Sequence, residues 1–220
     1  MKRLLLVWVL AAMLTAILGG GMVQAAAISE GALENAPPFD LECVSALLME
    51  PESGQVIFAA NENERRPVAS VTKIMTILLA MEALESGRVS MEDSVTVSKN
   101  AASMGGTQIL LDVGETQSFE ILLKSMIVGS ANDAAVAIAE HLYGSVEQFV
   151  AKMNGRAAEL GMNDTHFVNC TGLPAEGQQT TARDVAVMTM AMLSYPTYFD
   201  FSTVWLDEVD HGDGRITQLP

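Results

Sequence analysis

Ser70 and Lys73 are a pair of residues whose types and spacing could support nucleophilic chemistry. Residues three apart share a helix face, so the Lys73 amine can reach the Ser70 hydroxyl in a helical segment. A serine hydroxyl is a poor nucleophile until a neighbouring base takes its proton. Lysine can be that base where burial or nearby positive charge lowers its pKa towards the working pH. The pair therefore predicts a serine nucleophile with its base.

The position of this Ser-x-x-Lys tetrad strengthens that interpretation. With average usage of serine and lysine, a chain of this length carries about one such tetrad by chance. The alternative is then a serine N-cap followed one turn later by a solvated lysine. Here the serine follows Pro67-Val68-Ala69 and begins an apolar segment with helical spacing. The N-terminus of an apolar helix lowers the pKa of a lysine, and its free N–H groups can hold a developing oxyanion.

A second polar motif, Ser130-Ala131-Asn132, follows in a loop between two predicted helices. Such a loop can present a hydroxyl and a side-chain amide to the same cleft as Ser70. The Ser130 hydroxyl could pass a proton between lysine and a leaving group. The Asn132 amide could both donate to and accept from a peptide substrate. The alternative is that these residues only cap a helix.

Helices are expected over much of the chain. Apolar residues of segment 70–85 recur at helical spacing on more than one side, which predicts a helix buried in the centre of the fold. Gly87 follows as its C′ residue. Other helices are expected where a capping residue precedes an apolar pattern, namely from Ser118 to about Val128, from Asn132 or Asp133 to about Tyr143, from Ser145 to Leu160, and from Thr181 to before Pro196.

Strands are expected mainly near the beginning of the chain. Two apolar runs, residues 45–50 and 55–59, flank a Pro/Gly turn and predict a β-hairpin, which needs more strands or a helix to cover it. Residues 95–97 are a short strand candidate, and residues 108–113 form a second short apolar run. Residues 200–219, with 204–206 and 215–217, look like the start of more sheet.

The N-terminus and the composition bound the class of protein. Residues 1–25 have a basic start, an apolar run and small residues, which predict a cleaved secretory signal peptide, with an uncleaved membrane anchor as the alternative. Residues 26–42 read as a linker, and residues 43–220 as one domain. The formal net charge of −15 makes nucleic acid a poor partner. Cys43 and Cys170 are expected to be free, partly buried thiols, and the three histidines lack metal-ligand spacing.

These motifs lie within a longer likeness to a known family. The likeness includes residues 69–76 (ASVTKIMT), 129–135 (GSANDAA), 149–154 (FVAKMN), 160–167 (LGMNDTHF) and 172–173 (GL). In these segments the chain resembles the serine-acylating penicillin-binding proteins, which use S-x-x-K, then S-D-N or S-x-N, then K-T-G. The S-x-N form is typical of the D-alanyl-D-alanine carboxypeptidase branch, peptidase family S11. The likeness covers roughly residues 43–195.

The resemblance implies an α/β (α+β) fold of the β-lactamase/transpeptidase type, with an N-terminal hairpin of an antiparallel sheet and a helical subdomain. It implies that Ser70 attacks the penultimate D-alanine of a peptidoglycan stem peptide and that Lys73 is the base. Ser130 would pass the proton towards the leaving D-alanine, and Asn132 would hold the peptide amide and steady Lys73. Water would then hydrolyse the acyl-enzyme without a cofactor. β-Lactams would trap Ser70 because they mimic the D-alanyl-D-alanine end.

The chain departs from the family pattern in two ways. It contains no Lys-Thr-Gly sequence. In the family this motif lies on a later strand, helps bind the substrate carboxylate and supplies an oxyanion donor. We therefore expect a truncated sequence, without the later strands and the C-terminal region through which the family attaches to membranes. Cys170 stands where the family commonly has proline, which is expected to affect only the rigidity of its loop.

Two other functions stay open at this point. A class A β-lactamase uses a loop glutamate for deacylation, but residues 165–169 contain no acid, so slow turnover of β-lactams is expected. A non-catalytic module that binds cell-wall peptide is the second alternative, because the third motif is absent. We expect weak or no penicillin labelling of residues 1–220 alone, and clear labelling when a K-T-G strand follows. The predicted location is outside the cytoplasm, secreted or at the outer face of the membrane.

Overall fold

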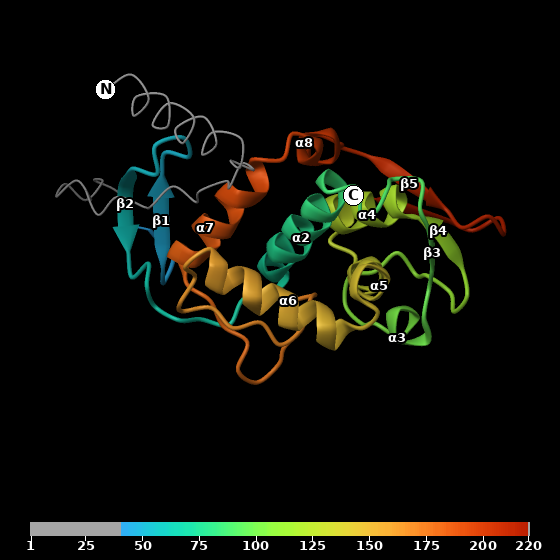
Figure 1. Ribbon diagram of the computed structural model, residues 1–220, viewed down its shortest axis with the longest axis horizontal. Coiled ribbons are helices and arrows are strands. Elements are labelled where there is room, and N and C mark those ends of the chain that lie inside the picture. The colour runs from blue at the N-terminus through green and yellow to red at the C-terminus, as the bar shows by residue number, and fades with distance from the viewer. Residues whose placement is uncertain (1–40, 220) are drawn as a thin grey trace, which may run out of the picture.

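The computed structural model of the chain describes residues 41–219, in which helices surround one central helix (Figure 1). The predicted signal peptide and nearly all of the predicted linker lie outside these residues. The elements, in chain order, are β1 (Ala46–Met49), β2 (Val56–Ala60), the 3₁₀ turn η1 (Ser70–Thr72), α2 (Lys73–Glu85), β3 (Ser94–Thr96), α3 (Lys99–Ala102), β4 (Thr116–Ser118), α4 (Phe119–Gly129), α5 (Asn132–Tyr143), α6 (Val146–Glu159), α7 (Ala182–Leu193), α8 (Thr197–Ser202), β5 (Asp207–Asp210) and β6 (Ile216–Leu219).

Helix α2 is the centre of the core, as its apolar pattern predicts. Met75, Leu78 and Leu79 are fully buried, and α4, α5, α6 and α7 all pack against the helix. The helix ends at Glu85, and Gly87 follows with a φ of +68°, a conformation that glycine adopts at little cost. The predicted helix start at Ser70 is a tighter 3₁₀ turn that leads into α2.

The other predicted helices also form, and three of them have their expected caps, whereas α5 has no side-chain cap. Ser118, Ser145 and Thr181 each accept a hydrogen bond from the backbone N–H three residues later, at the start of α4, α6 and α7. Gly161 follows α6 with a φ of +77°. Helix α8 was not predicted, because the segment Thr197–Ser202 is short and has no apolar repeat that the pattern could register.

The described strands form three separate antiparallel pairs, β1–β2, β3–β4 and β5–β6. The N-terminal hairpin is confirmed, with a bulge between Leu48 and Met49. The pairing of β3 with the polar strand β4 was not predicted, since the sequence Thr-Gln-Ser lacks an apolar alternation. The prediction of sheet near the C-terminal end is correct for β5–β6, but residues 204–206 precede the strand β5 instead of forming it.

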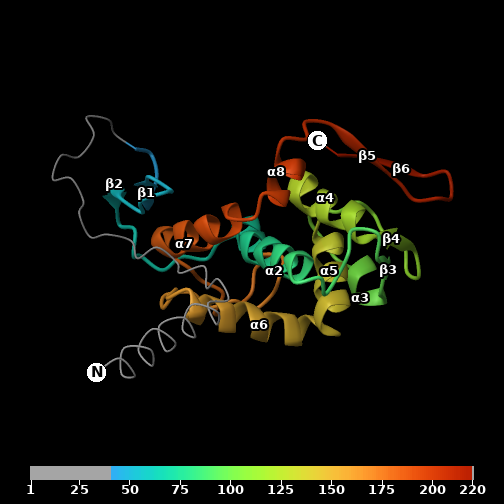
Figure 2. The same ribbon diagram turned by 45° about the horizontal axis from the view of Figure 1, so that its top comes forward.

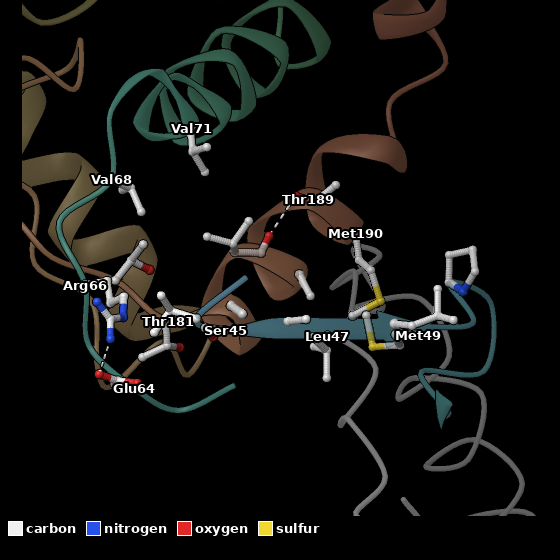
Figure 3. Close-up of a pocket in the computed structure, with 18 of the residues that line it drawn as sticks. Ser45, Leu47, Met49, Glu64, Arg66, Val68, Val71, Thr181, Thr189 and Met190 are labelled. Atoms are coloured by element: carbon white, nitrogen blue, oxygen red, sulfur yellow. Dashed lines mark hydrogen bonds and ion pairs between the residues drawn. The ribbon is translucent and has the colours of Figure 1, made fainter. Parts of the chain in front are cut away.

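Different strand pairs lie at the two ends of the molecule. The hairpin β1–β2 lies beside α7 at one end, and β5–β6 lies near β3–β4 at the other (Figure 2). A groove of about 750 Å³ runs between β1 and α7, bordered by Arg66 and Glu64 at its polar end (Figure 3). Most of the side chains that line it are apolar, including Leu47, Val185 and Met190.

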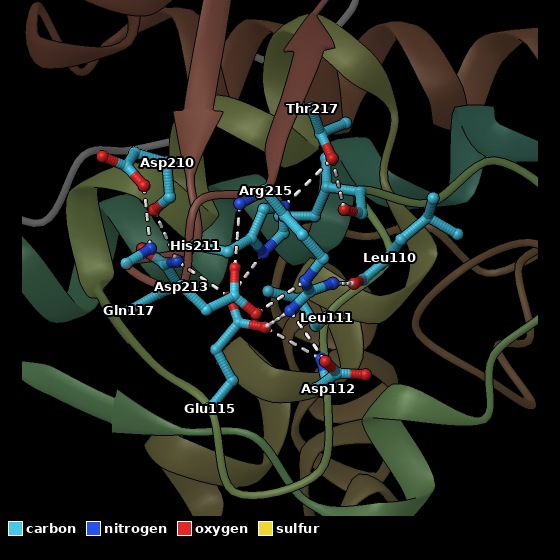
Figure 4. A network of polar contacts seen from close by, with 12 residues as sticks. Leu110, Leu111, Asp112, Glu115, Gln117, Asp210, His211, Asp213, Arg215 and Thr217 are labelled. Atoms are coloured by element: carbon cyan, nitrogen blue, oxygen red, sulfur yellow. Dashed lines mark hydrogen bonds and ion pairs between the residues drawn. The ribbon is translucent and has the colours of Figure 1, made fainter.

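A buried polar network fixes β5–β6 to the preceding structure (Figure 4). The His211 Nδ1 atom lies 2.6 Å from the Glu115 carboxylate, and its Nε2 atom lies 3.0 Å from the Thr217 hydroxyl. Thr217 donates in turn to the Ile109 carbonyl, and the Arg215 guanidinium contacts the Glu115 carboxylate at 3.2 Å. The network therefore holds the loop that contains Ile109 against the hairpin.

The two cysteines are free, as predicted, but they differ in burial: Cys170 is fully buried, whereas Cys43 is exposed. Within residues 41–219, no helix combines the length and the apolar character needed to cross a bilayer.

Candidate active site

Ser70 and Lys73 lie together at the start of the central helix. Ser70 is exposed, whereas Lys73, one turn later, is only 3% exposed. The Lys73 Nζ atom lies 3.3 Å from the Ser70 Oγ atom and donates to it. The 3₁₀ turn brings the two side chains to the same side, with the hydroxyl open to solvent and the amine beneath it. A substrate can therefore reach the nucleophile while water has little access to the base.

The surroundings of Lys73 shift its protonation equilibrium towards the neutral form. Burial, which disfavours the charged ammonium, lowers the pKa of Lys73 to about 8, and the nearby Cys170 thiol acts in the opposite direction. Burial also raises the pKa of Cys170 to about 12, so the thiol stays protonated near neutral pH. At pH 7 about a tenth of the Lys73 side chains are then neutral. A neutral amine can accept the Ser70 proton.

The cap alternative for this pair is wrong in the structure. The N-cap of the 3₁₀ turn is Ala69, and neither this turn nor α2 has a side-chain cap. Lys73 is buried rather than solvated, and its second hydrogen bond goes to the Thr171 carbonyl at 2.8 Å. The structure thus holds the lysine amine between a serine hydroxyl and a backbone carbonyl.

The Thr171 carbonyl belongs to a loop, residues 168–173, that is pressed against the first turns of the helix. The Thr76 hydroxyl donates to the Cys170 carbonyl at 2.8 Å. Gly172 has a φ of +86°, and a Cβ atom there would lie 1.9 Å from the Ala69 carbonyl oxygen. Only glycine fits this contact, because any side chain would collide with backbone. The loop is therefore fixed beside the Ser70–Lys73 pair.

Ser130 and Asn132 lie where α4 ends and α5 begins, close to the loop that was predicted between two helices. Ser130 ends α4 with a φ of +55°, and its hydroxyl is buried without a hydrogen-bond partner among the described residues. A buried hydroxyl without a partner is costly, and backbone strain of this kind is found at functional sites. Asn132, the first residue of α5, is 4% exposed.

The side chains of Ser130 and Asn132 do not act as helix caps, so that alternative is also wrong. The N-cap of α5 is Ala131, which has no side-chain cap. The Asn132 Nδ2 atom instead donates to the Gly105 carbonyl at 2.7 Å, and its backbone N–H donates to the Thr107 carbonyl at 2.7 Å. The implied contact between Asn132 and Lys73 is not among the hydrogen bonds of residues 41–219.

Asp133 anchors a later part of the loop that Asn132 contacts at Gly105. Its buried carboxylate accepts hydrogen bonds from the backbone N–H groups of Ile109, Leu111 and Ala134 at 2.9 to 3.2 Å. The apolar run 108–113 is therefore a loop anchored by a carboxylate, and it is not a strand of any sheet. Asn132 and Asp133 together set the path of residues 105–111.

Gly106 connects the two halves of the site. A Cβ atom there would lie 2.8 Å from the Asn132 Nδ2 atom and 3.5 Å from the Leu173 side chain. Leu173 ends the loop that supplies the Thr171 carbonyl to Lys73. The Asn132 region and the Lys73 region thus border the same loop, although Ser70 and Ser130 share no hydrogen bond in the described residues.

The apolar groove is separate from these polar residues. Val71, which is 40% exposed, lines it, but Ser70, Lys73, Ser130 and Asn132 do not (Figure 3). Neighbouring residues of the same turn therefore face different parts of the molecule. Size alone does not identify the site, because the groove lacks the convergent polar groups of a catalytic cleft.

Solved structures of penicillin-binding proteins share this fold. Penicillin-binding protein 5 from Haemophilus influenzae matches with a TM-score of 0.79 and 28% identity over 84% of this chain and 54% of its own. The D-alanyl-D-alanine carboxypeptidase DacD from Francisella tularensis matches with a TM-score of 0.74 and 33% identity over 76% of this chain and 41% of its own. The fold and the paired motifs define the penicillin-binding protein class.

Sequence comparison gives the family. The family model described as D-alanyl-D-alanine carboxypeptidase (Peptidase S11) matches residues 31–218, and the chain belongs to this family. The carboxypeptidase DacF of Bacillus subtilis is 47% identical over 76% of this chain and 43% of its own length. The carboxypeptidase DacD of Escherichia coli is 36% identical over 79% of this chain and 49% of its own. The chain thus spans about half the length of these curated relatives.

Several residues that shape the site belong to none of the predicted catalytic motifs. Thr171 acts through its backbone carbonyl, so its side-chain type gave no signal. Asp133 is a possible helix start and lies within the family likeness, but neither feature indicates that it anchors a loop 22 to 24 residues earlier in the chain. Gln178, which contacts the loop of residues 168–173, lies in a polar segment without any pattern. Gly172, like Asp133, had a signal through its part in the family likeness.

Proposed function

We propose that the protein is a serine-type D-alanyl-D-alanine carboxypeptidase that removes the terminal D-alanine from peptidoglycan stem peptides. The observation that carries this proposal is the buried Lys73 amine, 3.3 Å from the exposed Ser70 hydroxyl and with a pKa lowered to about 8 by burial. Membership of the peptidase S11 family and the printed names of the relatives support the substrate class.

In the proposed acylation step, the Ser70 oxygen bonds to the carbonyl carbon of the penultimate D-alanine, and its proton passes to the neutral Lys73 amine. The bond to the terminal D-alanine then breaks, and Ser130 passes a proton to the leaving amine. The unpartnered Ser130 hydroxyl is free to make such a contact. Asn132 holds the substrate amide. Water afterwards cleaves the ester at Ser70 and releases the shortened peptide.

β-Lactams are the proposed covalent inhibitors, since they mimic the D-alanyl-D-alanine end. The printed name of the Haemophilus influenzae neighbour, penicillin binding protein 5, supports this proposal. The class A β-lactamase alternative has less support, because residues 165–169 contain no acid and the nearby Asp164 pairs with Arg65 at 2.6 Å. Rapid turnover of a chromogenic cephalosporin would contradict the carboxypeptidase proposal.

Labelling with fluorescent penicillin tests the nucleophile. Two proteins are compared: this chain, and a chimera in which the C-terminal half of the Bacillus subtilis relative follows Leu219. We expect a covalent adduct on the chimera and little or none on the chain alone, which has no Lys-Thr-Gly sequence. Ser70→Ala should abolish the adduct, while Ser98→Ala, at the cap of α3, should not.

The outcomes separate the candidate functions. An adduct that persists in Ser70→Ala would contradict the assignment of the nucleophile. A folded chimera without any adduct would favour the non-catalytic module that binds cell-wall peptide. Strong labelling of the chain alone would show that the third motif is dispensable. Release of D-alanine from a stem pentapeptide by the chimera would then test the carboxypeptidase reaction itself.

We also propose that the protein is exported, and that it is secreted or lies at the outer face of the cytoplasmic membrane. The sequence of residues 1–25 supports this, with its basic start and apolar run. A fusion of residues 1–45 to a reporter that is active only outside the cytoplasm tests it. The reporter should be active, and Lys2→Glu with Arg3→Glu should reduce its export.

A further inference from the structure

Gln178 has a buried, uncharged side chain whose amide forms hydrogen bonds through both its oxygen and its nitrogen. It is 6% exposed. Its Oε1 atom accepts hydrogen bonds from the backbone N–H groups of Val168 and Asn169, at 3.1 and 3.0 Å. Its Nε2 atom donates to the Thr72 hydroxyl at 3.4 Å. One side chain therefore joins the loop of residues 168–173 to the turn that carries Ser70.

The contact with Thr72 lies inside the Ser70-x-x-Lys73 tetrad. Thr72 is fully buried, whereas Ser70, two residues earlier, is exposed. Helix α2 contacts the same loop again at Lys73 and at Thr76, through the carbonyls of Thr171 and Cys170. The start of the helix is therefore tied to this part of the chain at three positions, Thr72, Lys73 and Thr76. Gln178 makes the contact at Thr72.

Asn169 transmits this anchorage to the carbonyl that faces Lys73. Its Oδ1 atom accepts from the backbone N–H groups of Thr171 and Gly172, at 3.1 and 2.7 Å. Its Nδ2 atom donates to the Leu173 carbonyl at 2.8 Å. Since the backbone N–H of Asn169 is held by Gln178, the direction of the Thr171 carbonyl depends on both side chains.

We propose that Gln178 is a positioning residue for the reaction: by joining residues 168 and 169 to Thr72, it keeps the Thr171 carbonyl on the Lys73 amine and keeps water away from it. The proposal rests on the proposed function, in which Lys73 is the base. Gln178 forms no hydrogen bond with the Ser70 hydroxyl or the Lys73 amine, so it acts through the loop and through Thr72. The Thr171 carbonyl accepts a hydrogen bond from one N–H of the neutral Lys73 amine. The lone pair of the amine nitrogen then remains available to accept the Ser70 proton.

Release of the loop has a definite electrostatic consequence. The titratable group that acts on Lys73 is the Cys170 thiol, and Glu140 acts on that thiol in turn. Burial is the dominant influence on Lys73, and a loosened loop would admit water. Loss of the carbonyl contact alone would act in the opposite direction, because a carbonyl favours the ammonium. We expect burial to dominate, so the pKa of Lys73 should rise.

The test is a titration of the lysine side-chain nitrogens by NMR in the chain itself, labelled with ¹⁵N-lysine. The sequence has only five lysines, and Lys73→Met identifies the signal. Gln178→Met keeps the volume but removes all three hydrogen bonds. It should raise the pKa of Lys73 by roughly one pH unit. It should also speed amide hydrogen exchange at Val168 and Asn169 at least tenfold.

Gln179→Met is the matched control. Gln179 is the same residue type at the next position, and its side chain forms no hydrogen bond with the described residues, while its backbone pairs with His166. This variant should leave both the pKa of Lys73 and the exchange of Val168 and Asn169 unchanged. An equal effect of both substitutions would mean that general stability, and not positioning, controls Lys73.

A second variant decides the question where Gln178→Met does not fold. Thr72→Val is isosteric and removes only the acceptor of the Gln178 amide. It should raise the pKa of Lys73 by a smaller amount, and an unchanged value in a folded Thr72→Val protein would overturn the proposal. The titration needs no catalysis, so it can succeed even when the penicillin test of the proposed function fails. Unchanged pKa values in Gln178→Met, despite faster exchange in the loop, would also overturn it.

Discussion

The packing around α2, α4 and α5 differs from the packing between β1 and α7. In the first region, Leu78 and Leu79 are fully buried, and the side chains of Lys73 and Thr76 donate to carbonyls of the loop of residues 168–173. In the second region, an apolar groove of about 750 Å³ remains between the hairpin and the helix, and Leu48 on β1 is 52% exposed.

The start of the central helix lies on the boundary between these two regions. Lys73 faces the closed side, where the loop of residues 168–173 covers it, whereas Val71 faces the groove. Residues 41–219 therefore contain both the proposed base and the loop that covers it. The open side consists of a two-stranded hairpin and one helix, and a hairpin of this kind contributes little stability by itself.

The largest expected effect comes from Gly172→Ala in the closed region. The new Cβ atom would lie 1.9 Å from the Ala69 carbonyl oxygen, so the loop must move away from the helix. We expect the free energy of unfolding to fall by about 4 kcal/mol. Gly161→Ala is the control, because its φ is also positive but nothing lies within 4 Å, and it should cost about 1 kcal/mol. Urea unfolding measures both, and equal losses would contradict the close contact.

Leu78→Ala and Leu48→Ala compare the two regions directly. Leu78 is fully buried, so its truncation leaves a cavity and should cost about 3 kcal/mol. Leu48 is half exposed on β1, and its truncation should cost less than about 1 kcal/mol. Urea unfolding of the two variants is the measurement. Similar losses would mean that the hairpin is as tightly packed as the central helix.

Lys73→Met should stabilise the closed region while it removes the base. Burial lowers the pKa of Lys73 to about 8, so the folded state loses the lysine proton at lower pH than the unfolded state. The unfolded state binds more protons between pH 8 and about 10.5, so the contribution of this group to stability rises with pH in that window. Below pH 8 the cost of the buried ammonium is fully present.

We therefore expect Lys73→Met to raise the free energy of unfolding at pH 7 by about 2 kcal/mol, allowing for the unsatisfied Thr171 carbonyl. The gain should fall as the pH rises above 8 and become a loss of about 1 kcal/mol by pH 10.5, because the cost of the unsatisfied carbonyl does not depend on pH. Lys99→Met, on the surface helix α3, is the control and should show no such trend. A loss of stability at pH 7, or a gain independent of pH, would contradict the buried position of Lys73.

The smallest effect is expected at the β5–β6 end. His211→Gln replaces the ring that joins Glu115 to Thr217 and should cost about 1 kcal/mol, because one of the two contacts can be kept. Hydrogen exchange should become faster in β5–β6 and in the loop at Ile109, which Thr217 holds. Exchange in β1–β2 should not change. Faster exchange throughout the chain would show that the network stabilises the whole molecule.

Local patterns predicted most of the helices and the first hairpin. Caps such as Ser145 and glycines such as Gly161 mark helix ends because they satisfy backbone groups within a few residues. The pattern failed for β4 and α8, which are short and lack an apolar repeat. Of the candidate site, the pair Ser70 and Lys73 lies together as the spacing predicts.

The sequence by itself determined the chemical types and the local spacing, namely a serine and a lysine one turn apart and a second serine before an asparagine. It also determined the family, because the likeness extends over most of the chain. Only the tertiary structure decided that Lys73 is buried under the Thr171 carbonyl, 98 residues later, and that Asp133 and Gln178 anchor the loops around the site. The physical reason is that burial and backbone acceptors come from distant segments, and their residue types carry no local signature.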